Sequence, residues 1–226
     1  MAPLQQQADG DGKPSDGSAR RKLVAAARAA TSFSTASGRV LPTAFFVTDP
    51  TRTPDPASVV ARLPAGWGVI YRHFGAADRV AVGALLARIC RRRRLVLLVS
   101  ADPELARRIG ANGVHWPQAR LGGRQRQQPG SPHLIETASA HSRPALIAAW
   151  RSGVDAAIIS TVFASLSATA TAPMGMLRFR GLAKSSPLPV YALGGIGADT
   201  AGRIFSGVRT HIAGWAAVEA ISNAWK

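Results

Sequence analysis

Short apolar runs alternate with longer amphipathic segments from about residue 39 to the end of the chain. The apolar runs are rich in Val, Ile, Leu and Ala, which is typical of strands buried on both faces of a parallel sheet. The pattern predicts strands at residues 44–49, 67–72, 95–100, 113–116, 134–139, 155–160, 189–195 and 209–215. It predicts helices over residues 77–90, 104–110, 143–153 and 198–205.

One segment near the middle of the chain shows this repeat most clearly. The run LVLLV at 95–99 predicts a strand, and Asp102 followed by Pro103 predicts the N-cap and first turn of a helix. Gly110 ends that helix, and GVHW at 113–116 predicts the next short strand. A strand, a crossover helix and a parallel strand this close together form the repeating unit of a (β/α)8 barrel or of a doubly wound sheet.

The number of predicted strands separates these two α/β architectures. Eight strands with no duplicated sequence block match the (β/α)8 barrel, whereas a doubly wound sheet, the alternative, usually has roughly five to seven. We therefore predict a single (β/α)8 TIM barrel over residues 39–226. Both folds bind ligands at the carboxyl ends of the strands, so the residues that follow each strand are the candidates for chemistry.

The first 38 residues differ in composition from the rest of the chain. Gln, Gly, Asp and Ser dominate their opening part, and such a composition buries too little apolar surface to order a chain. We predict that residues 1–38 form a disordered, basic and polar N-terminal extension. Within it, residues 19–30 have the composition of a basic, Ala-rich helix. Asp9, Asp11 and Asp16 argue against a targeting peptide.

The chain is strongly basic, with a formal net charge of +16. The arginines are scattered apart from the block Arg91–Arg94, and no aromatic side chains alternate with that block as they do in single-strand binding sites. We interpret the block as a solvated helix end and expect no nucleic-acid partner. A basic cleft for a phosphorylated metabolite fits the same charge.

Cysteine content and hydropathy bear on the cellular setting. Cys90 is the one cysteine, so no intramolecular disulfide and no thiolate metal cluster can form, which favours a reducing, cytoplasmic location. No apolar run reaches the ~18 residues that a membrane-spanning helix needs, so we expect no membrane partner. The sequence leaves the oligomeric state undetermined.

Several strand ends carry motifs that occur in the same order and at the same spacing in one known family. The motifs are FFVTD at 45–49, VIYRHFG at 69–75, LLVSADPELARRIGANGVHWPQ at 97–118, SAHS at 139–142, STVFASLS at 160–167, PVYALGGI at 189–196 and AGWAAVEAI at 213–221. Through them, residues 43–223 resemble the thiamine phosphate synthase/TenI family of (β/α)8 barrels. Each motif alone is common by chance, and the resemblance rests on their order.

The resemblance implies a synthase that joins a pyrimidine diphosphate to a thiazole phosphate and expels pyrophosphate, with Mg²⁺ held by carboxylates. The two aspartates that hold the metal in the family correspond here to Ala101 and Arg120. We therefore predict no metal ligands and no cofactor. Mg²⁺-dependent synthase chemistry conflicts with these two residues, because preorganised charge usually supplies the largest catalytic effect.

Four polar residues are predicted from the resemblance to bind substrate or phosphate. Arg72 matches the arginine of a Gln-x-Arg-x-Lys motif that binds phosphate in the family, and the other two positions are Ile70 and Phe74 here. Ser100 stands in place of an asparagine after the third strand. Ser165 and Ser167 stand in place of two threonines in the loop after the sixth strand.

The SxHS motif supplies the candidate catalytic residue. In TenI-type members, which tautomerise a thiazole carboxylate phosphate, the histidine of this motif is the acid/base. Imidazole moves protons near neutral pH without a metal, so we predict catalysis by His141 and a substrate contact from Ser139. Alternatively, these two side chains only cap the following helix and satisfy loop backbone groups.

Gly194, Gly195 and Gly214 predict a phosphate site after the last two strands. Backbone N–H groups there, with a helix expected from about residue 216, make an anion-binding nest. Alternatively, the glycines only form a tight strand-to-helix turn. Glu219 replaces a small serine of the family in that helix, and its carboxylate would repel a phosphate.

Other residues at strand ends have two interpretations each. Asp49 either acts in catalysis or caps the following loop, and we prefer the cap. His115 lies within a predicted strand, where a buried, hydrogen-bonded structural role is more common than catalysis. Trp116 and Trp215 either wall an aromatic pocket or close the barrel mouth.

These observations predict a thiamine biosynthesis protein that binds a thiazole phosphate, or a related phosphorylated heterocycle, at the C-terminal face of the barrel. Whether it is an enzyme stays open: the candidates are a synthase (transferase), a metal-free TenI-like tautomerase (isomerase), and a non-catalytic ligand-binding or regulatory barrel. His141 favours the tautomerase over the synthase. Convergence of His141, Arg72 and Gly194-Gly195 on one pocket would favour an enzyme.

Overall fold

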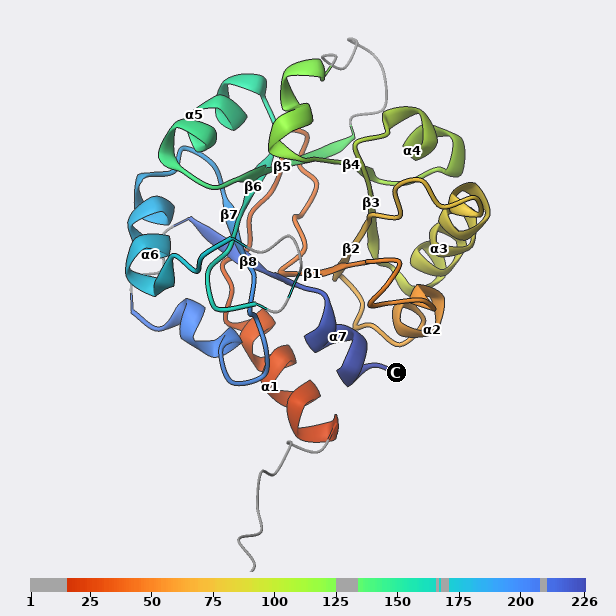
Figure 1. The fold of residues 1–226 in the computed structure, drawn as a ribbon, viewed down its shortest axis with the longest axis horizontal. Helices are drawn as coiled ribbons and strands as arrows, with labels where there is room; N and C mark the ends of the chain where they lie inside the picture. The colour runs from red at the N-terminus through yellow and green to blue at the C-terminus, as the bar shows by residue number, and fades with distance from the viewer. Residues whose placement is uncertain (1–15, 125–133, 166, 168–170, 208–210) are drawn as a thin grey trace, which may run out of the picture.

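Eight parallel strands close into a barrel in chain order, with helices around it (Figure 1). The computed structural model describes residues 16–124, 134–165, 167, 171–207 and 211–226. The strands are β1 Ala44–Val47, β2 Gly68–Tyr71, β3 Val96–Ser100, β4 Gly113–Trp116, β5 Ile135–Ala140, β6 Ala156–Ile159, β7 Val190–Leu193 and β8 Ile212–Ala217. The predicted single (β/α)8 barrel is confirmed.

The helices differ more from the sequence pattern than the strands do. They are α1 Asp16–Arg28, α2 Pro56–Val60, α3 Arg79–Arg93, α4 Pro103–Ile109, α5 Arg143–Ser152, α6 Gly175–Ser185 and α7 Glu219–Ala224, with 3₁₀ turns η1 Gln118–Gly123 and η2 Ala201–Phe205. The segment predicted as a helix over residues 198–205 forms only the short turn η2. The helix expected from about residue 216 begins at Glu219, because β8 continues to Ala217.

Local sequence explains the tight unit around α4. The Asp102 carboxylate accepts a hydrogen bond from the Leu105 backbone N–H at 2.8 Å, which satisfies one of the free donors of the first turn. Gly110 ends the helix with a φ of 66°, a backbone conformation that favours glycine. The predicted caps are confirmed, and β4 begins three residues after Gly110.

Alternate residues of each strand face the inside of the barrel. The interior cluster includes Phe45, Ile70, Leu98, Ile158 and Tyr191, all at most 1% exposed. The residues between them face outward and pack against the helices in a second, larger cluster. This alternation aims the last interior position of each strand at the C-terminal mouth of the barrel.

Part of the extension that was predicted to be disordered forms a helix, close to residues 19–30, where the composition indicated a basic, Ala-rich helix. Residues Asp16–Arg28 form α1, which packs against α7 and η2 and covers the side of the barrel (Figure 1). Leu23, Ala26 and Ala27 are buried on its inner side. One leucine and two alanines on one side of the helix are therefore its docking face. Residues 1–15 lie outside the described residues.

Two sequence interpretations concern α3. Cys90 is buried, and burial raises the pKa of its thiol to about 12, as expected for an inert core thiol. Arg91–Arg94 are exposed at the end of the helix, where cations complement the helix dipole. The block is therefore a solvent-exposed helix end, and the absence of a nucleic-acid partner stays a prediction. Within the described part of the chain, every helix is too short or too polar to cross a bilayer.

Candidate functional site

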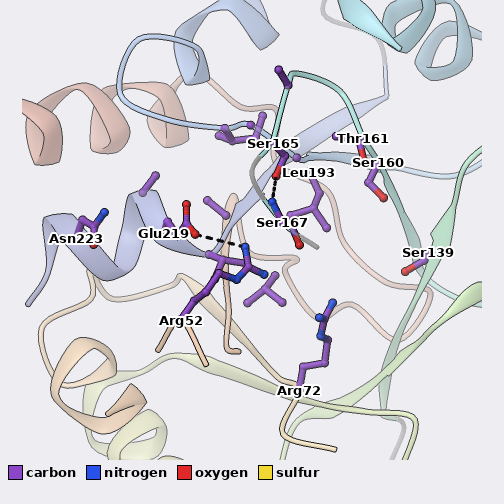
Figure 2. Close-up of a pocket in the computed structure, with 18 of the residues that line it drawn as sticks. Arg52, Arg72, Ser139, Ser160, Thr161, Ser165, Ser167, Leu193, Glu219 and Asn223 are labelled. Carbon is purple, nitrogen blue, oxygen red and sulfur yellow. Dashed lines mark hydrogen bonds and ion pairs between the residues drawn. The ribbon is translucent and has the colours of Figure 1, made fainter. Parts of the chain in front are cut away.

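A pocket with a volume of about 590 Å³ opens at the carboxyl ends of the strands (Figure 2). It brings together most of the residues that the sequence singled out. These are Arg72, Ser139, His141, Ser165, Ser167, Gly194, Gly195 and Glu219. Their elements are far apart in the chain, and the closed barrel brings them to one mouth. The convergence of His141, Arg72 and the paired glycines is thereby observed.

Ser100 and Gly214 do not line the pocket. Ser100 is fully buried inside the barrel at the end of β3. Gly214 lies within β8, where a Cβ atom would stand 2.0 Å from the backbone oxygen of Thr43. The glycine therefore serves the close approach of two backbone segments, three residues before the strand ends.

The two tryptophans also lie away from the pocket. Trp215 is fully buried and packs edge-on against Trp67, with ring centroids 5.4 Å apart. The Trp116 indole N–H donates to the Glu136 carboxylate at 3.0 Å. Both belong to the layer between strands and helices, because their strand positions face outward. Neither lines the pocket that the described residues form.

His141 presents its imidazole to the pocket from the end of β5. Its Nδ1 lies 2.7 Å from the Ser160 backbone oxygen, so Nδ1–H donates to that carbonyl. The side chain is exposed, and Nε2 makes no hydrogen bond with a described residue. The alternative that Ser139 and His141 cap the following helix is wrong, since Ser142 is the N-cap of α5. Its second part is observed for His141, which satisfies the loop backbone carbonyl of Ser160.

Two arginines and two carboxylates form a charged network at the mouth. Asp49 accepts from Arg52 at 3.0 Å and lies 3.5 Å from Arg72. Arg52 also lies 3.7 Å from Glu219 (dashed in Figure 2). Asp49 further accepts from the backbone N–H groups of Thr51 and Arg52, as predicted for a loop cap. Burial raises the pKa of Asp49, but hydrogen bonds and the charge of Arg52 outweigh it and lower that pKa.

The paired glycines after β7 have φ angles of +97° and +62°. A Cβ atom on Gly194 would stand 2.5 Å from Thr161, and one on Gly195 would stand 2.2 Å from the Ala164 backbone oxygen. The loop after β6 therefore packs directly on this turn, which by itself explains both glycines. The same turn lines the pocket, so its backbone also faces a ligand.

Gly195→Ala is expected to lower the free energy of unfolding by about 2 kcal/mol or more, because the left-handed backbone costs ~1–2 kcal/mol for an L-residue and the contact with Ala164 adds to it. Urea unfolding measures this change. Gly197→Ala is the matched control, since a Cβ there meets nothing within 4 Å. Equal effects of the two substitutions would contradict the packing argument.

The family model described as thiamine monophosphate synthase matches residues 44–221, almost the whole barrel. The chain belongs to the thiamine monophosphate synthase family. It is 28% identical over 170 residues to a thiamine-phosphate synthase of Alcanivorax borkumensis, covering 72% of this chain and 78% of that protein.

A thiamine-phosphate synthase of Synechococcus is 30% identical over 150 residues, which cover 65% of this chain and 42% of that protein. This chain therefore spans less than half of that relative. Among solved structures, a thiamine phosphate pyrophosphorylase of Pyrococcus furiosus superposes with a TM-score of 0.63 over 81% of this chain and 91% of that one. At 20% identity, this likeness shows the fold.

The residues of this family member do not fit the Mg²⁺ ion that the resemblance implies. The Ala101 side chain offers no oxygen, and Arg120 is exposed with its guanidinium 5.7 Å from the Phe74 ring centroid. In the described ranges, no three His, Cys, Asp or Glu side chains gather in a way that could hold a metal. Glu219 lines the pocket but faces Arg52. A hard cation needs several oxygen ligands, which this arrangement does not supply.

Sequence reasoning missed Arg52, Ser160 and Asn223, which also line the pocket of this family member. Arg52 follows Asp49 by three residues in the loop after β1, and that spacing was the one available signal for it. Ser160 contacts His141 Nδ1 through its backbone oxygen at 2.7 Å and through its hydroxyl at 3.3 Å. Asn223 reaches the pocket from α7, a helix that the sequence pattern placed several residues too early.

Proposed function

We propose that this member of the family is a metal-free isomerase of the TenI type, which moves a proton on a thiazole carboxylate phosphate bound in the pocket. The observation that carries the proposal is the meeting of His141, Arg72 and the Gly194–Gly195 turn around one cavity. A titratable side chain next to cationic donors suits proton transfer on an anionic ligand.

His141 would act as both base and acid. Because Ser160 O accepts from Nδ1–H, the neutral ring carries its lone pair on Nε2, where it can take a proton from the ligand. The resulting imidazolium keeps its hydrogen bond to the Ser160 carbonyl. It then returns the proton to a different atom of the heterocycle, which completes an isomerisation without metal or net charge transfer.

The phosphate would lie between the arginines and the turn after β7. The guanidinium groups of Arg72 and Arg52 offer paired N–H donors that match phosphate oxygens. Both side chains are held by Asp49, which orders them before a ligand arrives. Positively charged donors that are already in place bind an anion without the entropic cost of ordering them.

Calorimetric titration tests the proposal with three ligands, each with and without Mg²⁺: thiazole phosphate, its carboxylated precursor and the pyrimidine diphosphate. Binding of the thiazole compounds without metal, weakened in Arg72→Ala, supports the isomerase and leads to a tautomerase assay. Mg²⁺-dependent binding of the pyrimidine diphosphate would overturn it in favour of the synthase. Binding without turnover would favour a non-catalytic barrel.

Glu219→Gln is expected to raise the affinity for thiazole phosphate about three- to tenfold. The substitution removes a carboxylate that lies 3.7 Å from Arg52 and competes with the ligand phosphate for that guanidinium. Asp199→Asn removes one negative charge from an exposed pair with Lys22 and serves as the control. Unchanged affinity in Glu219→Gln, or an equal gain in the control, would place the phosphate away from Arg52.

A further inference from the structure

A row of polar side chains crosses the barrel interior below the pocket. Ser100, His115 and Thr137 lie side by side in register on β3, β4 and β5. Ser100 and Thr137 are fully buried and His115 is 7% exposed. Polar groups in an otherwise apolar interior are costly unless hydrogen bonds compensate, so their arrangement calls for an explanation.

His115 connects this row to the pocket. Its Nδ1 lies 2.9 Å from the Thr137 hydroxyl, and its Nε2 lies 3.0 Å from the Ser139 hydroxyl. Ser139 follows Thr137 by two residues, so both face the inside of the barrel, but Ser139 lies one step closer to the mouth and lines the pocket (Figure 2). A continuous set of hydrogen bonds therefore leads from the buried interior to the ligand site.

The imidazole of His115 stays neutral at physiological pH. Burial and the nearby positive charge of Arg72 lower the pKa of His115 to about 3. A neutral imidazole has one N–H and one nitrogen with a free lone pair, so it donates one of its two hydrogen bonds and accepts the other. When Nδ1–H donates to Thr137, the Ser139 hydroxyl donates to Nε2, so toward the pocket it can only accept a hydrogen bond. When Nε2–H donates to Ser139, the Ser139 hydroxyl proton is free to donate to a ligand.

We propose that His115 is a positioning residue whose tautomer sets whether Ser139 accepts or donates a hydrogen bond in the pocket. The inference deepens the proposed function and rests on it for the ligand. The two tautomers of a heterocycle differ in which atom carries a proton, so a fixed donor would stabilise one and oppose the other. A hydroxyl that reverses its direction stabilises both, and no charge enters the barrel interior.

The coupling is tested first in the ligand-free protein by ¹⁵N NMR of the labelled histidine rings between pH 5 and 8. The expected result is a neutral His115 throughout, with a tautomer ratio that changes in Ser139→Ala and changes in the opposite sense in Thr137→Val. Ser165→Ala, a pocket serine without a described bond to His115, should leave the ratio unchanged. An unchanged ratio in Ser139→Ala, or a ring that titrates near pH 6.5, overturns the inference whether or not any ligand binds.

The second arm adds thiazole phosphate. A shift of the His115 tautomer ratio in the wild type that is lost in Ser139→Ala supports the inference, and a shift that persists in Ser139→Ala overturns it. His115→Gln, which keeps one donor and one acceptor, should retain the affinity within about threefold, whereas His115→Leu should lose about three- to tenfold. Failure of thiazole phosphate to bind the wild type counts against the proposed function, and the ligand-free arm then decides the coupling.

Discussion

Replacing His141 with glutamine is expected to slow isomerisation of a thiazole carboxylate phosphate by about 100- to 10,000-fold, the usual contribution of a positioned acid/base. Glutamine can still donate a hydrogen bond to the Ser160 carbonyl, so the loop after β5 should keep its shape. It has no group that exchanges a proton near neutral pH. Single-turnover kinetics, with the ligand affinity measured separately, isolates the proton-transfer step from binding.

His211→Gln is the matched control for this substitution. His211 is exposed directly before β8, at the opposite end of the strand from the pocket, so its loss should leave the rate unchanged. A His141→Gln variant that keeps more than a tenth of the wild-type rate would remove His141 from catalysis. If its affinity for the thiazole phosphate fell instead, the histidine would be a ligand contact only.

The barrel could be predicted because its strands carry their own signal. Most of the strands are buried on both faces and carry short runs rich in apolar residues, as β1, β3 and β6 do. The end of β8 was placed too early, since Ala216 and Ala217 also read as a helix start. Gly214 was consequently assigned to a phosphate site, although it serves a close contact with Thr43.

The docking of α1 was missed for a different reason. Its buried stripe consists of Leu23 and two alanines among basic side chains, and the segment itself carries no sign of what this stripe packs against. The stripe is buried because α7 and η2 pack against it. That surface comes from the far end of the chain, so no local pattern contains it.

The candidate site was predictable where the family resemblance supplies a motif, loop residues such as Ser165 and Gly195 included, and hidden at Arg52, which lies outside those motifs. Arg72 and Ser139 were predicted from the resemblance, and the alternation of β2 and β5 explains why both side chains face the mouth. Arg52 lies in a loop and reaches the pocket because Asp49 and Glu219 hold its guanidinium. Such a position depends on charges from both ends of the chain, which a single sequence does not place together.

Removal of the buried carboxylate of Glu136 is expected to have the largest effect on stability. Glu136 points outward from β5, is 4% exposed, and accepts hydrogen bonds from Arg124 and from the Trp116 indole. Arg124 also donates to the Ser152 carbonyl at 2.6 Å, which ties η1 to the end of α5. Glu136→Ala leaves a guanidinium and an indole N–H buried without this acceptor. Breaking one side of a buried ion pair costs about 3–5 kcal/mol.

Urea unfolding of Glu136→Ala measures this loss against Glu104→Ala, which removes an exposed carboxylate in the first turn of α4 and should cost less than about 1 kcal/mol. The double variant Arg124→Met/Glu136→Leu separates the two origins of the effect. If the cost comes from a buried unpaired charge, the apolar pair should recover most of it, because well-packed apolar side chains often replace a buried ion pair without loss. A double variant as unstable as Glu136→Ala would instead mean that the specific hydrogen bonds of Arg124 hold η1 in place.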